Sequence, residues 1–119
     1  MVDSLVIKRG TVVFVEDVNK TSKGHVMKGK HPAVVIQNEK GNQYSPTLIV
    51  CFLSSQLKRL EMRTHVLLQH YDNLKLSVVQ AEQMATIDRT AVLDVVEQLR
   101  PEDMARIDAA IKYSLGLEV

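Results

Sequence analysis

The chain has 119 residues, of which 45% are hydrophobic and 24% are charged, and its formal net charge at pH 7 is +1. This length suits one domain with its own core, so residues 1–119 are expected to form a single domain. A net charge near zero excludes a protein that is basic or acidic throughout, so any nucleic-acid binding must use a local patch. No stretch has the pattern of a signal peptide or a membrane span, and a cytoplasmic protein is expected.

The first predicted strand covers residues 11–15, TVVFV, and follows a turn at Arg9 and Gly10. The next stretch, residues 18–31, contains no acidic residue and two glycines, and it holds Lys20, Lys23, Lys28 and Lys30. Glycines and like charges predict a flexible basic loop. Two interpretations are open: a solvated loop between hairpin strands, or a lid that attracts phosphate groups.

Two further strands are predicted at residues 33–38, AVVIQN, and 47–55, TLIVCFLSS, joined by a long turn at 39–46. Each strand has at least four consecutive apolar residues instead of an alternating pattern. Such runs are typical of strands buried on both faces, at the centre of a sheet or barrel.

Polar side chains that could carry chemistry stand at the two ends of this predicted hairpin. His31 precedes the first strand, and Ser54 and Ser55 close the second. Because hairpin strands are antiparallel, His31 and Ser54 are expected at the same end of the sheet. A candidate site therefore lies there.

The only cysteine, Cys51, lies inside the second of these apolar strands. One cysteine forms no internal disulfide and no cysteine-rich metal site, and the four histidines have no spacing typical of zinc ligands. We therefore expect a buried structural thiol, no metal and no cofactor.

The second half of the chain predicts further short elements. A short helix is expected at 56–60, strands at 64–69, 77–85 and 92–99, and a helical turn at 86–91 that Thr86 or Asp88 could cap. A C-terminal helix begins at Pro101 and stops near Gly116, with one apolar stripe formed by Met104, Ile107, Ile111 and Leu115. The expected fold class is α+β, mostly β: a small barrel of antiparallel strands with short helices and a C-terminal helix.

Several segments together resemble the MazF/PemK toxin family, in register from about residue 6 to residue 117. They are KRGTVVFVED, KHPAVVIQNEKGNQYSPTLIVCFLSSQ, RTHVLL, SVVQAEQMATIDR and the closing SLGL. The resemblance implies an SH3-like barrel that forms a homodimer and acts as the toxin of a toxin–antitoxin pair. It also implies cutting of single-stranded RNA at short sequences without a metal, and a cognate antitoxin that occludes the site with an acidic C-terminal segment.

The resemblance also implies site residues. The family's main catalytic arginine stands just before the proline that opens the second strand, and His31 occupies that position before Pro32. A serine or threonine that hydrogen-bonds the scissile phosphate corresponds to Ser54. The expected catalytic residues are therefore His31 and Ser54, and the expected RNA- or phosphate-binding residues are Lys20, Lys23, Lys28, Lys30, Ser55 and Gln56.

This sequence departs from the family pattern at three kinds of position. His31 replaces the arginine, the glutamate and glutamine of the family loop are absent between Gly24 and Pro32, and Ala85 stands where a basic residue is usual. Imidazole exchanges protons near neutrality but is only partly charged there, whereas guanidinium is a permanent cation.

Three functions therefore stay open. The first is a nuclease in which His31 performs acid–base work and Lys28 or Lys30 supplies charge. The second is a catalytically silent relative that binds RNA or an antitoxin, and the third is a gyrase inhibitor of the related CcdB type. His65 is expected to serve packing or a dimer contact, while Tyr44 and Phe52 could stack on bases, with Phe52 better placed for the core.

Overall fold

The structure, a computed structural model, describes residues 6–16 and 30–117. In that part of the chain six strands form one antiparallel sheet with the spatial order β4-β5-β3-β2-β1-β6. The strands are β1 (Thr11–Glu16), β2 (Lys30–Val35), β3 (Thr47–Ser54), β4 (His65–Leu68), β5 (Ser77–Asp88) and β6 (Val92–Gln98). The helices are α1 (Glu39–Tyr44), the 3-10 helix η2 (Arg89–Ala91) and α2 (Pro101–Ser114).

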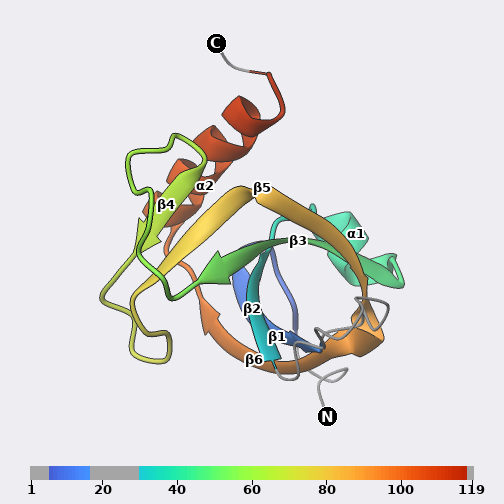
Figure 1. The fold of residues 1–119 in the computed structure, drawn as a ribbon. Helices are drawn as coiled ribbons and strands as arrows, with labels where there is room; N and C mark the ends of the chain where they lie inside the picture. Colours follow the sequence, from blue (N-terminus) through green and yellow to red (C-terminus); the bar gives the residue numbers. More distant parts are fainter. Residues whose placement is uncertain (1–5, 17–29, 118–119) are drawn as a thin grey trace, which may run out of the picture.

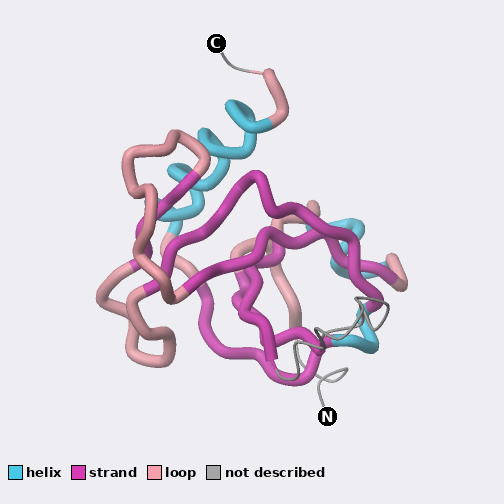
Figure 2. The backbone as a smooth tube through the Cα atoms, viewed as in Figure 1, coloured by secondary structure: helices cyan, strands magenta, loops and turns pink. Residues whose placement is uncertain are grey.

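The sheet curls into a small barrel, and the predicted α+β, mostly β class is confirmed. Figure 1 shows β5, β3, β2, β1 and β6 curving around an interior, with α2 outside this ring beside β4. Figure 2 shows the same path as a tube, in which most of the ring is strand and the helices lie outside it.

Strands β2 and β3 are buried on both faces, as their unbroken apolar runs predict, and β1 is buried on both faces as well. Successive side chains of a strand point to opposite faces of the sheet. In β2, Val34 joins a cluster that includes Ile107 of α2, whereas its neighbour Val35 joins a second cluster with Val13 and Val50. The sheet is thus packed against α2 on one side and fills the barrel interior on the other.

The C-terminal helix starts where the sequence predicts. Pro101 occupies its first turn, where a missing N–H costs nothing, and Glu102 lies at the positive end of the helix dipole. Ile107 is fully buried, and Gly116 follows the helix with a φ of 74°, a conformation that suits glycine. Leu115 was expected in the apolar stripe, but 55% of it is exposed, because the chain leaves helical geometry at this capping residue.

Arg89, in η2 between β5 and β6, hydrogen-bonds to the segment between α1 and β3. The Arg89 backbone N–H donates to the Pro46 carbonyl oxygen at 2.9 Å. Its guanidinium donates to the Ser45 carbonyl oxygen at 3.0 Å and to that of Asn42. These contacts tie η2 to the segment between α1 and β3.

Four further sequence-based expectations need correction. The strand predicted at 33–38 lies three residues earlier, because β2 runs from Lys30 to Val35, so Lys30 and His31 belong to a strand and not to the predicted basic loop. The predicted turn at 39–46 contains α1, because the Asn38 side chain accepts a hydrogen bond from the Gly41 N–H at 2.8 Å and caps a helical turn. Residues 56–60 form no helix. The predicted helical turn at 86–91 is half strand, since β5 continues to Asp88, whose side chain makes no capping hydrogen bond to η2.

Among the described residues, no helix is long and apolar enough to cross a membrane.

Candidate functional site

A groove lies at the end of the β2–β3 hairpin. The two strands pair Val34 with Cys51 and Ala33 with Phe52, and His31 and Ser54 lie two residues beyond this last pair, at the same end of the hairpin. A cavity of about 630 Å³ opens there. We call it the hairpin groove; it is lined by Phe14, Lys30, His31, Pro32, Leu53, Ser54, Ser55, Gln56, Asn73, Leu74, Lys75 and Ser77.

The structure brings together every predicted site residue that it describes: His31, Ser54, Lys30, Ser55 and Gln56 all line the hairpin groove. The other three lysines of the prediction, Lys20, Lys23 and Lys28, lie outside the described residues.

The hydroxyl of Ser54 is oriented by the backbone that follows it. Its Oγ accepts a hydrogen bond from the Gln56 N–H at 3.1 Å. Because the hydroxyl accepts here, its own hydrogen can be donated to another group, such as a phosphate oxygen. A serine followed by this local turn is therefore suited to contact an anion in the groove.

Lys30 forms part of the first wall, on β2. Its Nζ lies 5.5 Å from the centre of the Phe14 ring, within the range of a cation–π interaction. Phe14 also lines the groove, so an ammonium and an aromatic face are neighbours at this wall.

Another part of the lining comes from the connection between β4 and β5, which is not predicted as part of the site. Leu74 is buried in the cluster that packs against α2, and Lys75 follows it with an exposed side chain. The Ser77 hydroxyl donates to the Lys75 carbonyl oxygen at 2.8 Å, which fixes the backbone there. Strands β3 and β4 separate these residues from His31 along the chain, so a local sequence pattern does not reveal their proximity.

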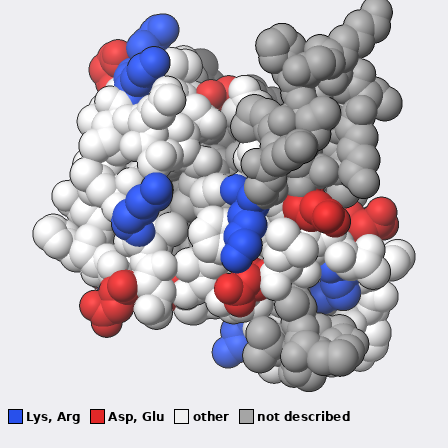
Figure 3. All heavy atoms as spheres, turned by 60° about the horizontal axis from the view of Figure 1, so that its bottom comes forward, with Lys and Arg blue, Asp and Glu red and all other residues white. Residues whose placement is uncertain are grey.

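The described lining of the groove contains two lysines and a histidine but no carboxylate. Elsewhere the charges alternate: Figure 3 shows Lys and Arg side chains interspersed with Asp and Glu on one face, among the residues drawn in colour. The groove is therefore a local anion-attracting site on a molecule of nearly neutral net charge.

His65 and Glu82 form a second polar cluster, outside the groove. His65 Nε2 lies 3.0 Å from Glu82 Oε2, and its Nδ1 lies 3.3 Å from the Lys58 carbonyl oxygen. The His65 side chain is only 6% exposed, as expected for packing rather than catalysis. Burial raises the pKa of Glu82, but hydrogen bonds from His65 and from the backbone outweigh it, so the net pKa is lowered.

Cys51 is fully buried, as the sequence predicts. Burial, followed by the charge of Glu82, raises the pKa of this thiol to about 11, against a smaller opposing effect of Arg9. A thiol that stays protonated at neutral pH is a poor nucleophile.

The two aromatic residues considered for base stacking lie in different settings. Phe52 packs partly buried against the cluster in the barrel interior, as expected for the core. Tyr44 is 73% exposed at the end of α1, away from the groove lining.

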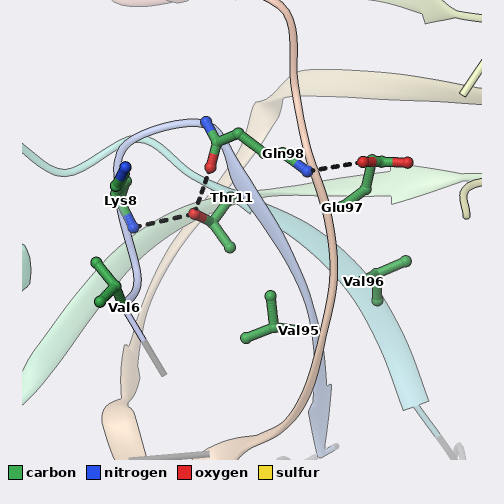
Figure 4. Close-up of a pocket in the computed structure, with 7 residues that line it drawn as sticks. All are labelled: Val6, Lys8, Thr11, Val95, Val96, Glu97 and Gln98. Carbon is green, nitrogen blue, oxygen red and sulfur yellow. Dashed lines mark hydrogen bonds between the residues drawn. The ribbon is translucent and has the colours of Figure 1, made fainter. Parts of the chain in front are cut away.

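A second hollow of about 380 Å³ lies between the segment before β1 and β6, and Figure 4 shows its lining. The Thr11 hydroxyl accepts from the Lys8 N–H at 2.9 Å and bonds the Gln98 side chain at 2.8 Å. These polar groups satisfy one another, so this hollow offers less to a ligand than the hairpin groove. Among the described residues, no group of three His, Cys, Asp or Glu side chains is placed to hold a metal ion.

The fold resembles solved toxin structures. One is an endoribonuclease in complex with its cognate antitoxin from Mycobacterial species, with a TM-score of 0.77 and 20% identity over 94% of this chain and 97% of that chain. Another is a MazE-MazF complex from Deinococcus radiodurans, with a TM-score of 0.77 and 21% identity over 96% and 99% of the two chains.

Sequence comparison is more specific. The chain is 36% identical over 115 residues to the Bacillus subtilis (strain 168) protein named Endoribonuclease EndoA, covering 95% of this chain and 97% of the relative. The family described as PemK-like, MazF-like toxin of type II toxin-antitoxin system matches residues 8–115. The resemblance carried by the sequence motifs is thereby confirmed, and the chain belongs to the PemK-like, MazF-like toxins of type II toxin-antitoxin systems.

Proposed function

We propose that this chain is an endoribonuclease toxin that cuts single-stranded RNA at short sequences, without a metal, in the hairpin groove. The observation that carries the proposal is that His31 and Ser54 line one groove, whose described lining has lysines and no carboxylate. The chain's 36% identity to a protein named Endoribonuclease EndoA supports the same activity.

Cutting RNA without a metal needs a base, an acid and groups that bind the phosphate. The RNA's own 2′-hydroxyl attacks the phosphorus and the bond from phosphorus to the 5′-oxygen breaks. A base must take the 2′-hydroxyl proton, and an acid must protonate the leaving oxygen. His31 brings the only imidazole of the described groove lining, and imidazole is the side chain most often used for such transfers, so we assign one of the two to His31 and the other to water.

Ser54 and Lys30 serve the phosphate. The Ser54 hydroxyl donates to a non-bridging oxygen, since its Oγ already accepts from the Gln56 N–H. Lys30 supplies positive charge as the phosphorane forms, and Lys20, Lys23 and Lys28 add charge that draws RNA to the groove. Ser55 and Gln56 offer further hydrogen bonds to the RNA at the same wall.

The proposal includes the partners that the family membership suggests. Residues 1–119 act as one domain, the protein works as a homodimer in the cytoplasm, and a cognate antitoxin neutralises it. Complexes of an endoribonuclease with its cognate antitoxin and of MazE with MazF support a toxin–antitoxin complex for this chain too. A positively charged groove suits occlusion by an acidic antitoxin segment.

The test is incubation of the purified protein with a long mixed-sequence RNA in EDTA, followed by mapping of the fragment ends. Discrete cuts are expected. His31→Ala should lower the rate about 10²- to 10⁴-fold, the range for lost general acid–base catalysis. Ser54→Ala should lower it about tenfold through one lost charge-assisted hydrogen bond. His70→Asn, outside the groove lining at a position with positive φ that asparagine tolerates, is the matched control and should cut normally.

Uncut RNA from roughly pH 5.5 to 8.5 would contradict the nuclease. If His31→Arg then cut RNA, the natural protein would be a silent relative whose site lacks only the guanidinium. If both proteins bound RNA without cutting it, binding would be the remaining function. Inhibition of DNA gyrase without RNA cleavage would support the gyrase inhibitor instead.

A further inference from the structure

We propose that Lys75 binds a backbone phosphate of the RNA next to the cut, from the part of the hairpin groove formed by the connection between β4 and β5. This inference rests on the proposed function and names a contact that the family motifs did not assign. Lys75 lies between β4 and β5, and it shares the groove with His31 and Ser54. The groove lining thus carries two lysines from different parts of the fold, Lys30 on β2 and Lys75 between β4 and β5.

The backbone around Lys75 is held by contacts on both sides. Leu74 is only 8% exposed and packs into the cluster beneath α2. The Ser77 hydroxyl donates to the Lys75 carbonyl oxygen at 2.8 Å, and the Asn73 N–H donates to Glu97 Oε2 at 3.1 Å. A lysine whose backbone is fixed loses less conformational freedom when it binds a ligand. Its position therefore suits contact with one particular phosphate better than non-specific attraction of RNA.

The same connection is also braced against α2. The Tyr71 hydroxyl donates to Asp103 Oδ2 at 2.6 Å and accepts from the Arg100 N–H at 2.8 Å. Asp103 is only 6% exposed. The wall that carries Lys75 is therefore anchored to the core of the molecule rather than being a loosely attached loop.

The charge of Lys75 is not used within the described part of the protein. None of the described carboxylates forms an ion pair with its ammonium, whereas Lys30 lies over the Phe14 ring. An exposed lysine is usually just a solvated charge. Here the side chain lines the same cavity as the candidate catalytic residues, and no acid in the described lining offsets it.

The chemistry of the site gives this cation a role. The described groove lining has no arginine, the permanent cation that binds phosphate with a planar fork, so its lysines are the residues that bring an ammonium to the phosphodiester. A phosphate contact beside the cut fixes the register of the RNA. It stabilises the bound substrate and the transition state equally. Loss of such a contact raises KM and leaves kcat nearly unchanged.

The experiment compares Lys75→Gln with Lys40→Gln. Lys40 lies on α1, at the opposite end of the β2–β3 hairpin, and its substitution removes the same charge. Binding is measured on a 2′-O-methyl oligonucleotide with the mapped cleavage site, which cannot be cut because its nucleophile is blocked. Lys75→Gln should weaken binding about tenfold at low salt and reduce the slope of log Kd against log salt by about 0.7, the value for one phosphate of a single strand.

Lys40→Gln should leave the salt slope unchanged, and Lys75→Arg should restore most of the affinity, since arginine also binds phosphate. On cleavable RNA, Lys75→Gln should raise KM about tenfold with kcat within about twofold of the original. Circular dichroism checks that each variant is folded.

The failures are distinguishable. If the unmodified protein cuts RNA but Lys75→Gln and Lys40→Gln have the same affinity and salt slope, the role of Lys75 is wrong and the nuclease stands. If Lys75→Gln lowers kcat with KM unchanged, a flanking phosphate contact is also wrong. If the unmodified protein neither cuts nor binds RNA, both proposals fail.

Discussion

The two ends of the β2–β3 hairpin use their polar groups in opposite ways. At the α1 end, Arg89 donates to main-chain oxygens of Ser45 and Asn42, and these bonds close the barrel. At the other end, the polar side chains of His31 and Ser54 line an open groove. One pair of strands thus supports a structural end, whose hydrogen bonds serve folding, and a binding end, whose groups face a ligand.

Replacing Arg89 should have the largest effect on stability and mark the α1 end as structural. Arg89→Ala leaves carbonyl oxygens at the α1–β3 junction without their donor, and we expect the free energy of unfolding to fall by about 2–3 kcal/mol. Urea denaturation measures this loss. Lys75→Gln, which changes an exposed side chain of the groove lining, is the matched variant at the binding end and should change stability by less than about 0.5 kcal/mol. Equal losses in the two variants would contradict the division between the ends.

Tyr71→Phe tests the brace behind the binding end. The ring remains, but buried Asp103 loses a hydrogen-bond donor and the Arg100 N–H loses an acceptor. We expect a loss of about 1–2 kcal/mol in the free energy of unfolding, together with a higher KM for RNA because the wall carrying Lys75 is less well held. A stability loss with KM unchanged would show that this wall does not depend on the brace.

Acid should weaken the His65–Glu82 pair, which lies outside both ends. Because the pKa of Glu82 is lower in the folded protein than its ordinary value of 4.5, its charge stabilises the fold above that pH. This contribution is lost as the pH falls through the folded value. Between about pH 5 and pH 3 the free energy of unfolding should fall less in Glu82→Gln than in the unmodified protein. The difference between the two falls should be less than about 1 kcal/mol, because the Glu82 carboxylate is partly solvated. Parallel pH–stability curves for the two proteins would be evidence against this linkage.

The thiol of Cys51, in the middle of β3, should stay inaccessible to reagents in the folded protein. Its thiol is fully buried and has a pKa raised to about 11. In the folded protein we expect no measurable reaction with a disulfide reagent at neutral pH, and complete reaction in guanidinium chloride. Rapid labelling of the folded protein would mean that the centre of the hairpin opens locally.

Local patterns in the sequence predicted most of the fold. The apolar runs of β2 and β3 indicated burial on both faces, and Pro101 and Gly116 delimited the region of α2. The helix α1 was missed because Gly41 and Asn42 are typical turn residues, although Asn38 before Glu39 is also a common helix start. Residues 56–60 form no helix; instead the Lys58 N–H donates to the Gln56 carbonyl oxygen and the Lys58 carbonyl oxygen lies 3.3 Å from His65 Nδ1.

The site was predictable only where it follows from the hairpin. Antiparallel pairing of two neighbouring apolar runs is enough to place His31 and Ser54 at one end of the sheet. Lys75 was not predicted as part of the site, because its position depends on β5 pairing with β3 and on Leu74 packing beneath α2. Such contacts between distant segments leave no periodic signal in the sequence.

The order of the sheet also bears on how the protein avoids aggregation. Among residues 6–16 and 30–117 the two edge strands are β4 and β6, and a sheet edge can recruit strands from other molecules. β4 is only four residues long, and β6 carries Asp94 and Glu97. A short edge and a charged edge both discourage strand addition, so copies of this barrel can accumulate without joining into a continuous sheet.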